Sequence, residues 1–170
     1  MTLSKNEQFR IDHELMTVAQ FDELVQECLG KITLLGVVGS RRTGKSWAAH
    51  DWVIGRRDDI ELAAYVEYLA PGLSVSYSLG FGGGVRLLRD DSYPRYALDS
   101  VDIVVVDEPA RCLPFVQTLL TLSSPVAGTA AHRLVVLLLQ DVRLLRAFAL
   151  REGVFRCFDT CGAPISDLIF

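Results

Sequence analysis

The hydrophobic residues of this chain are grouped in short continuous runs, separated by segments in which apolar residues recur every three or four positions. Residues 32–38, 101–106 and 134–139 are almost wholly apolar, and residues 63–69 and 154–158 have the length of strands. Such unbroken runs are typical of parallel strands that helices cover on both faces. Strand and helix segments alternate without an internal repeat, so we predict a single α/β domain with a mainly parallel sheet.

Two helical segments are well marked. The first begins with Thr17 as N-cap and Gln20 as its capping-box partner, and Gly30 ends it. Its apolar face carries Phe21, Leu24, Val25, Cys28 and Leu29. The second spans residues 45–57, and the residues that it turns toward the core are Ala48, Ala49, Trp52 and Val53.

The remaining segments have weaker patterns. Residues 1–16 are mostly polar and are predicted as a flexible N-terminal arm, in which Phe9, Ile11 and Leu15 would allow an edge strand. Further along the chain we expect an extended segment over residues 73–79, a short helix near Leu87 and Leu88, and helical segments over residues 109–122 and 142–150.

The composition is that of one apolar domain. The chain has 170 residues, of which 50% are hydrophobic and 22% charged, and its mean hydropathy is +0.28. The longest apolar runs are far shorter than the ~18 residues of a membrane span. Charged residues also interrupt the first 14 positions, which argues against a signal peptide. We therefore expect no membrane insertion and a cytoplasmic protein. The net charge of −4 argues against a protein that coats nucleic acid through bulk charge.

A glycine-rich segment directly after the first of these strands carries the clearest chemistry. Glycines let a backbone fold around an anion, and the helix that follows adds its positive N-terminal end. Lys45 adds a compact charge for the β- and γ-phosphates of a nucleotide, and the Ser46 hydroxyl is placed to hold Mg²⁺. The segment fits the pattern G-x-x-x-x-G-K-[ST] and predicts a phosphate-binding loop formed by Gly39, Ser40, Arg41, Arg42, Thr43, Gly44, Lys45 and Ser46.

A pair of acids follows another buried strand. Asp107 and Glu108 come directly after the run 101–106, and α/β sheets bind ligands at the carboxyl ends of their parallel strands. We expect Asp107 to hold Mg²⁺ together with Ser46. We expect Glu108 to act as the general base that activates a water molecule for attack on the γ-phosphate. Lys45 and Glu108 are therefore the predicted catalytic residues at this stage.

The loop, combined with an apolar strand that ends in Asp-Glu, resembles the P-loop NTPases that carry a catalytic Glu after the Walker B Asp. This resemblance implies a three-layer fold with strand order 5-1-4-3-2, in which residues 134–139 lie between the loop strand and the Asp-Glu strand. It also implies a catalytic role for Gln140, whose side chain would face the γ-phosphate. The run Leu-Leu-Leu-Gln-Asp is similar to that of DNA translocation, packaging and conjugation motors and of filamentous-phage assembly ATPases. Residues 17–170 would then form one P-loop NTPase domain that binds ATP and Mg²⁺.

Members of that branch often complete the site with an arginine from a neighbouring subunit, so the resemblance implies a homo-oligomer or a complex with a partner protein. Nucleic acid stays open as a partner. Arg41 and Arg42 would contact phosphate or the next subunit. For the other candidates the competing interpretation is a solvated or ion-paired surface residue. These candidates are Arg111, Arg143, Arg146, Arg151 and Arg156.

The glycine run at residues 80–84 is interpreted as a mobile loop, which Phe81, Arg86 and Arg89 would equip to contact a substrate. Its sequence, Leu-Gly-Phe-Gly-Gly, departs from the L-S-G-G-Q signature of transporter-type ATPases. That family therefore fits the chain poorly.

Three functions remain open from the sequence. The first is Mg²⁺-dependent ATP hydrolysis that drives a nucleic-acid-translocating or macromolecular-assembly machine. The second is a nucleotide-gated regulatory module that hydrolyses slowly and works through its partner, and the third is a small-molecule kinase. A GTPase fits less well, because residues 107–110 do not match D-x-x-G and the chain contains no N-K-x-D.

Overall fold

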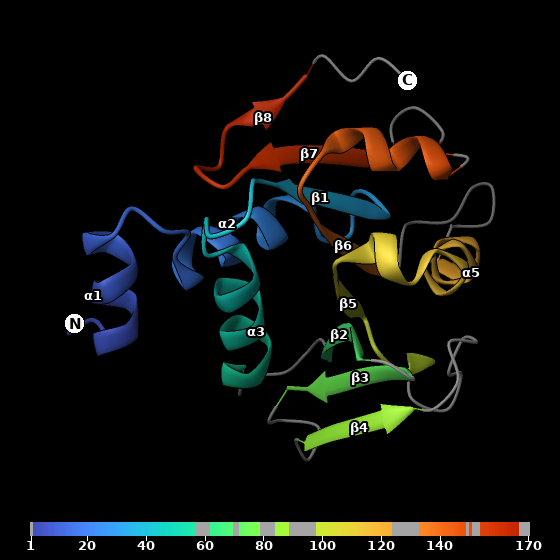
Figure 1. Ribbon diagram of the computed structural model, residues 1–170, viewed down its shortest axis with the longest axis horizontal. Helices are drawn as coiled ribbons and strands as arrows, with labels where there is room; N and C mark the ends of the chain where they lie inside the picture. The colour runs from blue at the N-terminus through green and yellow to red at the C-terminus, as the bar shows by residue number, and fades with distance from the viewer. Residues whose placement is uncertain are drawn as a thin grey trace.

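An eight-stranded sheet forms the centre of the computed structural model, which describes residues 2–56, 62–69, 72–78, 84–88, 98–123, 133–148, 150 and 154–166 (Figure 1). The strand order across the sheet is β4-β3-β2-β5-β6-β1-β7-β8. Strands β1, β2, β5, β6 and β7 are mutually parallel. The strands are β1 (Leu34–Val38), β2 (Ala63–Leu69), β3 (Gly72–Tyr77), β4 (Gly84–Leu88), β5 (Ile103–Asp107), β6 (Leu134–Leu139), β7 (Phe155–Asp159) and β8 (Pro164–Ile165). The predicted α/β class with a mostly parallel sheet is confirmed.

The strand order of the whole sheet differs from the predicted order 5-1-4-3-2, so that prediction was wrong. Strands β3 and β4 extend the sheet beyond β2, and β8 extends it beyond β7. The cause is local pairing: Leu69 is the partner of Gly72, so the chain returns directly along β2, and an antiparallel return needs no crossover helix. Strand β8 pairs with β7 in the same antiparallel way. In the interior of the sheet, β6 lies between β1 and β5, where residues 134–139 were expected.

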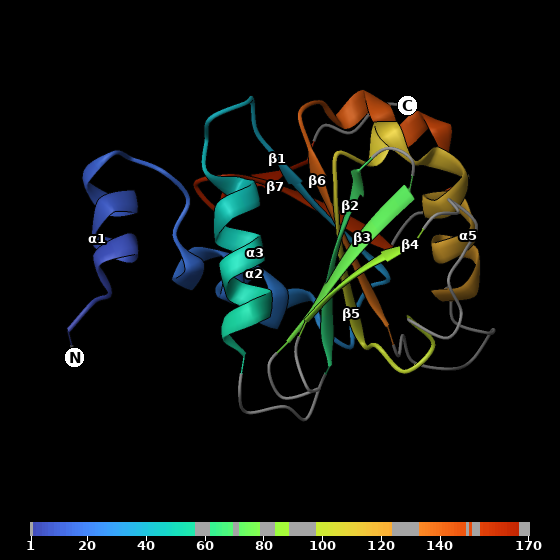
Figure 2. The same ribbon diagram turned by 60° about the horizontal axis from the view of Figure 1, so that its bottom comes forward.

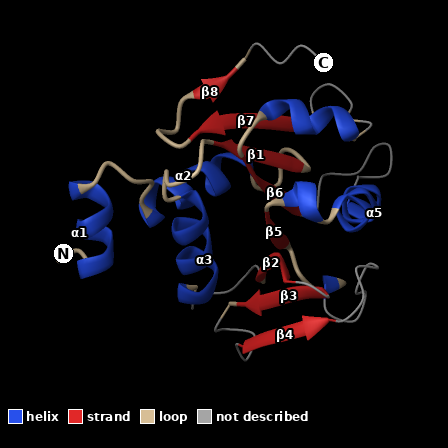
Figure 3. Cartoon of the chain, in the orientation of Figure 1, coloured by secondary structure: helices blue, strands red, loops and turns tan. Residues whose placement is uncertain are grey.

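Helices cover both faces of the sheet (Figures 2 and 3). Helices α2 and α3 lie on one face, and α5 lies on the other. Two buried clusters match these layers: Phe21 and Trp52 belong to the first, and Phe115 and Leu119 to the second. The helices are α1 (Lys5–Asp12), α2 (Val18–Cys28), α3 (Lys45–Gly55) and α5 (Leu113–Ser123), with the 3₁₀ helices η2 (Pro109–Arg111) and η3 (Val142–Ala147).

Helix α2 forms as the sequence predicts. The Thr17 Oγ1 accepts the Gln20 amide at 3.1 Å, and the Gln20 side chain accepts the Thr17 amide at 2.9 Å, which completes the capping box. Its predicted apolar face is buried at Phe21, Leu24, Val25 and Cys28. Local sequence therefore positions the helix that packs beside α3.

Two local predictions were wrong. Residues 5–12 form helix α1 and not an edge strand, because Ser4 caps its first turn by accepting the Glu7 amide at 3.1 Å. Leu87 and Leu88 lie in strand β4 and not near a helix, because residues 84–88 pair antiparallel with β3. The predicted substrate-contacting loop involves Phe81, Arg89 and residues 80–83, which lie outside the described residues. In the described part of the chain, no helix is long and apolar enough to cross a membrane.

The strand register decides which residues meet at one edge. Val38 at the end of β1 pairs with Leu139 at the end of β6, and Leu138 pairs with Asp107 at the end of β5. The residues that follow these three strands therefore emerge side by side. A pocket lies at this edge of the sheet.

Candidate functional site

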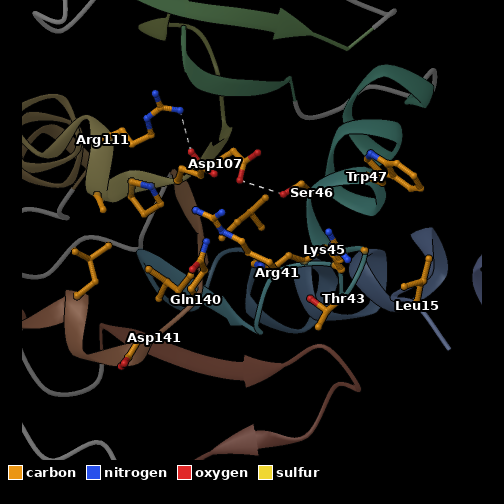
Figure 4. A pocket seen from close by; sticks show the side chains of 18 of the residues that line it. Leu15, Arg41, Thr43, Lys45, Ser46, Trp47, Asp107, Arg111, Gln140 and Asp141 are labelled. Carbon is orange, nitrogen blue, oxygen red and sulfur yellow. Dashed lines mark hydrogen bonds and ion pairs between the residues drawn. The ribbon is translucent and has the colours of Figure 1, made fainter. Parts of the chain in front are cut away.

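A pocket of about 1260 Å³ opens at the carboxyl edge of β1, β5 and β6 (Figure 4). The first turn of α3 and the segment before α2 complete its walls. It brings together nearly all of the site residues predicted from the sequence. Those that line it are Arg41, Arg42, Thr43, Gly44, Lys45, Ser46, Asp107, Glu108 and Gln140.

Short hydrogen bonds fix the segment between β1 and α3. The Gly39 amide donates to the Leu139 carbonyl at 2.9 Å, which ties the start of the loop to the end of β6. The Thr43 hydroxyl donates to the Ser40 carbonyl at 2.9 Å, and the Lys45 Nζ donates to the same carbonyl at 3.2 Å. The loop is thus a closed turn with the Lys45 ammonium drawn across it.

Both glycines of the loop are required by the geometry. A Cβ at Gly39 would lie 2.7 Å from the Thr160 Cγ2, and a Cβ at Gly44 would lie 2.9 Å from the Leu15 Cβ. Gly44 also has φ +83°, a left-handed conformation that side chains rarely adopt. The motif glycines therefore serve the close approach of neighbouring chain segments as well as the turn.

Lys45 is a charged side chain held almost out of water. It is 7% exposed, and burial lowers its pKa, while the negative charges of Asp107 and Glu108 oppose this shift. Its ammonium lies at the N-terminus of α3, where the helix dipole already favours an anion. A buried ammonium whose described hydrogen bond goes to one carbonyl retains donors for an anion in the pocket.

Asp107 links the helix to the sheet. Its Oδ1 accepts the Ser46 hydroxyl at 3.1 Å (Figure 4), and its Oδ2 accepts the Tyr65 hydroxyl at 2.6 Å. Burial, the charge of Asp107 and this hydrogen bond raise the pKa of Tyr65, so the phenol stays a donor. A hydroxyl and a carboxylate oxygen in contact form the type of donor pair that Mg²⁺ prefers. The pair Ser46 and Asp107 therefore fits a magnesium ion.

Glu108 and Gln140 lie at the mouth of the pocket. Glu108 has φ +46° and is exposed, and its Oε2 accepts from the Arg111 Nη1 at 3.2 Å. Gln140 is also exposed, at the tip of β6. A carboxylate in this position can accept a proton from a water molecule in the pocket, and the adjacent amide can orient that water.

The candidate arginines take different positions. Arg111 lines the pocket, whereas the Arg143 Nε donates to the adjacent Asp141 carboxylate at 2.8 Å, which lowers the pKa of Asp141 to about 2. Arg156 pairs with Glu27 of α2 at 3.2 Å. Arg146 is exposed on η3, and Arg151 is outside the described residues.

Several residues at or next to the pocket were not predicted from the sequence. Tyr65 of β2 does not line the pocket but contacts Asp107, and it carried a detectable signal, because a hydroxyl inside a buried apolar run needs a partner. Phe9, His13, Leu15 and Trp47 also line the pocket, and Figure 4 shows Leu15 and Trp47 on the other side of Lys45 from Asp107. The first three come from the segment predicted as a flexible arm, whose position depends on tertiary contacts and not on a motif. Its flexibility stays a prediction.

The fold and the pocket together define an α/β protein with a pocket at the carboxyl edge of a mostly parallel sheet, lined by charged as well as apolar residues. No family model, curated protein or solved structure matches the chain. The geometry and chemistry of the site therefore indicate its function.

Proposed function

We propose that this chain is a P-loop NTPase of the branch with an additional strand, which binds ATP with Mg²⁺ and hydrolyses it. The observation that carries the proposal is the 3.1 Å contact between the Ser46 hydroxyl and Asp107, from two segments 61 residues apart. In a P-loop site these two side chains hold the metal ion, and a buried Lys45 stands beside them. Burial of an ammonium group costs free energy, so a buried lysine next to a hydroxyl and a carboxylate is not expected unless the three groups share a function.

The roles of the residues follow from their positions. The Lys45 ammonium and the N-terminus of α3 bind the β- and γ-phosphates and offset their negative charge. Mg²⁺, when bound by Ser46 and Asp107, supplies charge stabilisation to the same oxygens. Glu108 takes a proton from a water molecule whose oxygen forms the new bond to the γ-phosphorus, and the bond from that phosphorus to the β-γ bridging oxygen breaks. Gln140 orients the water, and the products are ADP and phosphate.

The proposed use of this hydrolysis is to drive a machine that translocates nucleic acid or assembles macromolecules. A homo-oligomer or a complex with a partner protein would supply an additional arginine in trans. Light scattering with and without a non-hydrolysable ATP analogue tests this part: a nucleotide-dependent ring supports it, and a monomer under all conditions contradicts it.

A second candidate, a nucleotide-gated module with slow hydrolysis, is favoured by one contact. Arg111 engages the Glu108 carboxylate at 3.2 Å, and this contact occupies an oxygen that a general base needs for the attacking water. An Arg111→Ala variant that raises the rate of ATP hydrolysis would support slow, gated turnover. An unchanged or lower rate would favour the motor.

Two substitutions that remove different donors to Asp107 test the metal site. We expect Ser46→Ala to abolish most of the Mg²⁺ dependence of ATP binding, because Ser46 is the proposed metal ligand. Tyr65→Phe removes the other hydroxyl that contacts Asp107 and is the matched control, so its binding should still depend on Mg²⁺. Titration calorimetry of ATP with and without Mg²⁺ measures both. Equal behaviour of the two variants would contradict the proposed roles of Ser46 and Asp107.

A further inference from the structure

The end of the pocket opposite the acids is lined by exposed aromatic rings. Phe9 is 47% exposed and Trp47 is 64% exposed, and both line the same pocket as Lys45. Figure 4 shows Trp47 and Leu15 on one side of Lys45 and Asp107 and Gln140 on the other. Aromatic rings that line a pocket offer apolar surface that a bound ligand can remove from water.

Two of these rings form a preassembled surface. Phe9 and His13 stack with their centroids 3.9 Å apart and their planes 25° from parallel. The His13 Nδ1 is 2.9 Å from the Phe9 carbonyl oxygen, one helical turn back, which holds the imidazole beside the phenyl ring. A flat pair of rings of this kind offers a stacking face to a third aromatic system.

Specific contacts hold this surface against the phosphate loop. The Met16 amide donates to the Thr43 carbonyl at 3.0 Å, and Leu15 packs against Gly44. Arg10, only 4% exposed, donates to Asp51 of α3 and to Glu7 at 3.4 Å. The segment before α2 is therefore attached both to the loop and to the helix that follows the loop.

Glu7 anchors the same segment to α2. Its carboxylate oxygens accept the Val18 amide at 2.9 Å and the Ala19 amide at 3.2 Å, at the N-terminus of that helix. Carboxylates are stabilising at this position. Helix α1 thus has a defined place beside the pocket, and hydrogen bonds of Glu7 and Arg10 hold the segment that carries Phe9 and His13.

We propose that Phe9, His13 and Trp47 form the binding site for the base of the nucleotide. This inference rests on the proposed function, because it takes the position of the phosphates from Lys45 and Ser46. If the γ-phosphate faces Glu108 and Gln140, the α-phosphate, ribose and base extend toward the other side of Lys45, where Figure 4 shows Trp47, and Phe9 and His13 line the same pocket. A base stacks on aromatic side chains through its π-face, which tolerates different bases.

The test compares a ligand with a base to one without. The probes are MgATP and magnesium tripolyphosphate, and titration calorimetry gives the dissociation constant of each. We expect Phe9→Ala and Trp47→Ala to weaken ATP binding about tenfold and to leave tripolyphosphate binding unchanged. The matched control is Ile11→Ala, since Ile11 is as exposed as Phe9 on the same helix, at 47%, and is not among the described residues that line the pocket.

Fluorescence gives a second measurement. The chain has two tryptophans, and Trp52 is 4% exposed while Trp47 is open to solvent. We expect MgATP, but not tripolyphosphate, to change the tryptophan emission of the wild type, and Trp47→Phe to remove that change. Circular dichroism of each variant checks that it folds.

The outcomes separate the two proposals. If the wild type binds neither probe, or if Lys45→Ala binds both as well as the wild type, the proposed function fails and the base site with it. If both probes bind and need Lys45, but Phe9→Ala and Trp47→Ala leave ATP affinity unchanged or weaken both probes equally, only the base site is overturned. A selective loss of ATP affinity supports it.

Discussion

At one end of the pocket, Lys45, Ser46 and Asp107 come from segments whose sequence pattern already indicates their chemistry. At the other end, Phe9 and His13 come from a segment with no such pattern, which a network around Arg10 holds in place, and Trp47 follows Ser46 in the first turn of α3. The first end is polar and fixed by hydrogen bonds between backbone and side chain, and the second is aromatic and exposed. A sequence motif therefore indicates the residues that bind the part of a ligand shared by many proteins. The part that distinguishes one ligand from another is built by tertiary packing.

The largest difference between the two ends of the pocket is expected when the proposed general base, Glu108, is substituted. We expect Glu108→Gln to lower the rate of ATP hydrolysis by about 10²–10⁴-fold, since general-base catalysis contributes that much. Affinity for MgATP should change little, because Glu108 lies at the mouth of the pocket and its described partner is Arg111. Single-turnover phosphate release and calorimetry measure the two quantities. Glu23→Gln, at an exposed position of α2, is the control. Intact turnover in Glu108→Gln would show that another group takes the proton.

Gly44 of the phosphate loop contacts Leu15 of the segment before α2, so a substitution at Gly44 should disturb both ends of the pocket. Gly44→Ala places a methyl group against Leu15 at a residue with φ +83°, so we expect a loss of roughly 1–3 kcal/mol in the free energy of unfolding. Affinity for ATP and for tripolyphosphate should fall together. Gly55→Ala, in the last turn of the same helix, meets no atom within 4 Å and should be neutral or slightly stabilising. Chemical denaturation compares the two variants, and equal stabilities would contradict the close contact with Leu15.

The smallest expected effect is on the pH dependence of the free energy of unfolding, through Tyr65 beside Asp107. The folded state raises the pKa of Tyr65, so it binds this proton more tightly than the unfolded state does. The stabilisation is therefore complete below the ordinary tyrosine pKa of about 10 and is lost as the pH rises above it. At neutral pH, Tyr65→Phe should lose about 1–2 kcal/mol through the hydrogen bond to Asp107.

Above about pH 10 the stability difference between wild type and Tyr65→Phe should shrink. Burial also raises the pKa of Cys28 and of Cys157 to about 11, but both thiols are present in both proteins, so their contribution cancels in the difference. Urea unfolding between pH 7 and pH 11 measures it. Parallel curves for the two proteins would show that Tyr65 does not ionise differently in the folded state.

The same division explains how far sequence could predict this molecule. Helix α2 was predicted by its caps, and the meeting of Lys45, Ser46 and Asp107 was predicted by motif and strand position, since both are local signals combined with one rule about parallel sheets. The hairpin strand β4 was missed, because its pairing partner decides its conformation. The place of Phe9 was missed for a similar reason: it depends on Arg10 reaching Asp51, 41 residues away.

The position of β1 between β6 and β7 has a consequence for the synthesis of the chain. Both neighbours of β1 are synthesised about a hundred residues later. The hydrogen bond from the Gly39 amide to the Leu139 carbonyl cannot form before then. Contacts between such distant segments form slowly and late in folding. A nascent chain that stops before residue 134 would leave both edges of an apolar strand unpaired, a form prone to aggregation. We expect the pocket, which Leu138 and Leu139 of β6 help to line, to form only after β6 has left the ribosome.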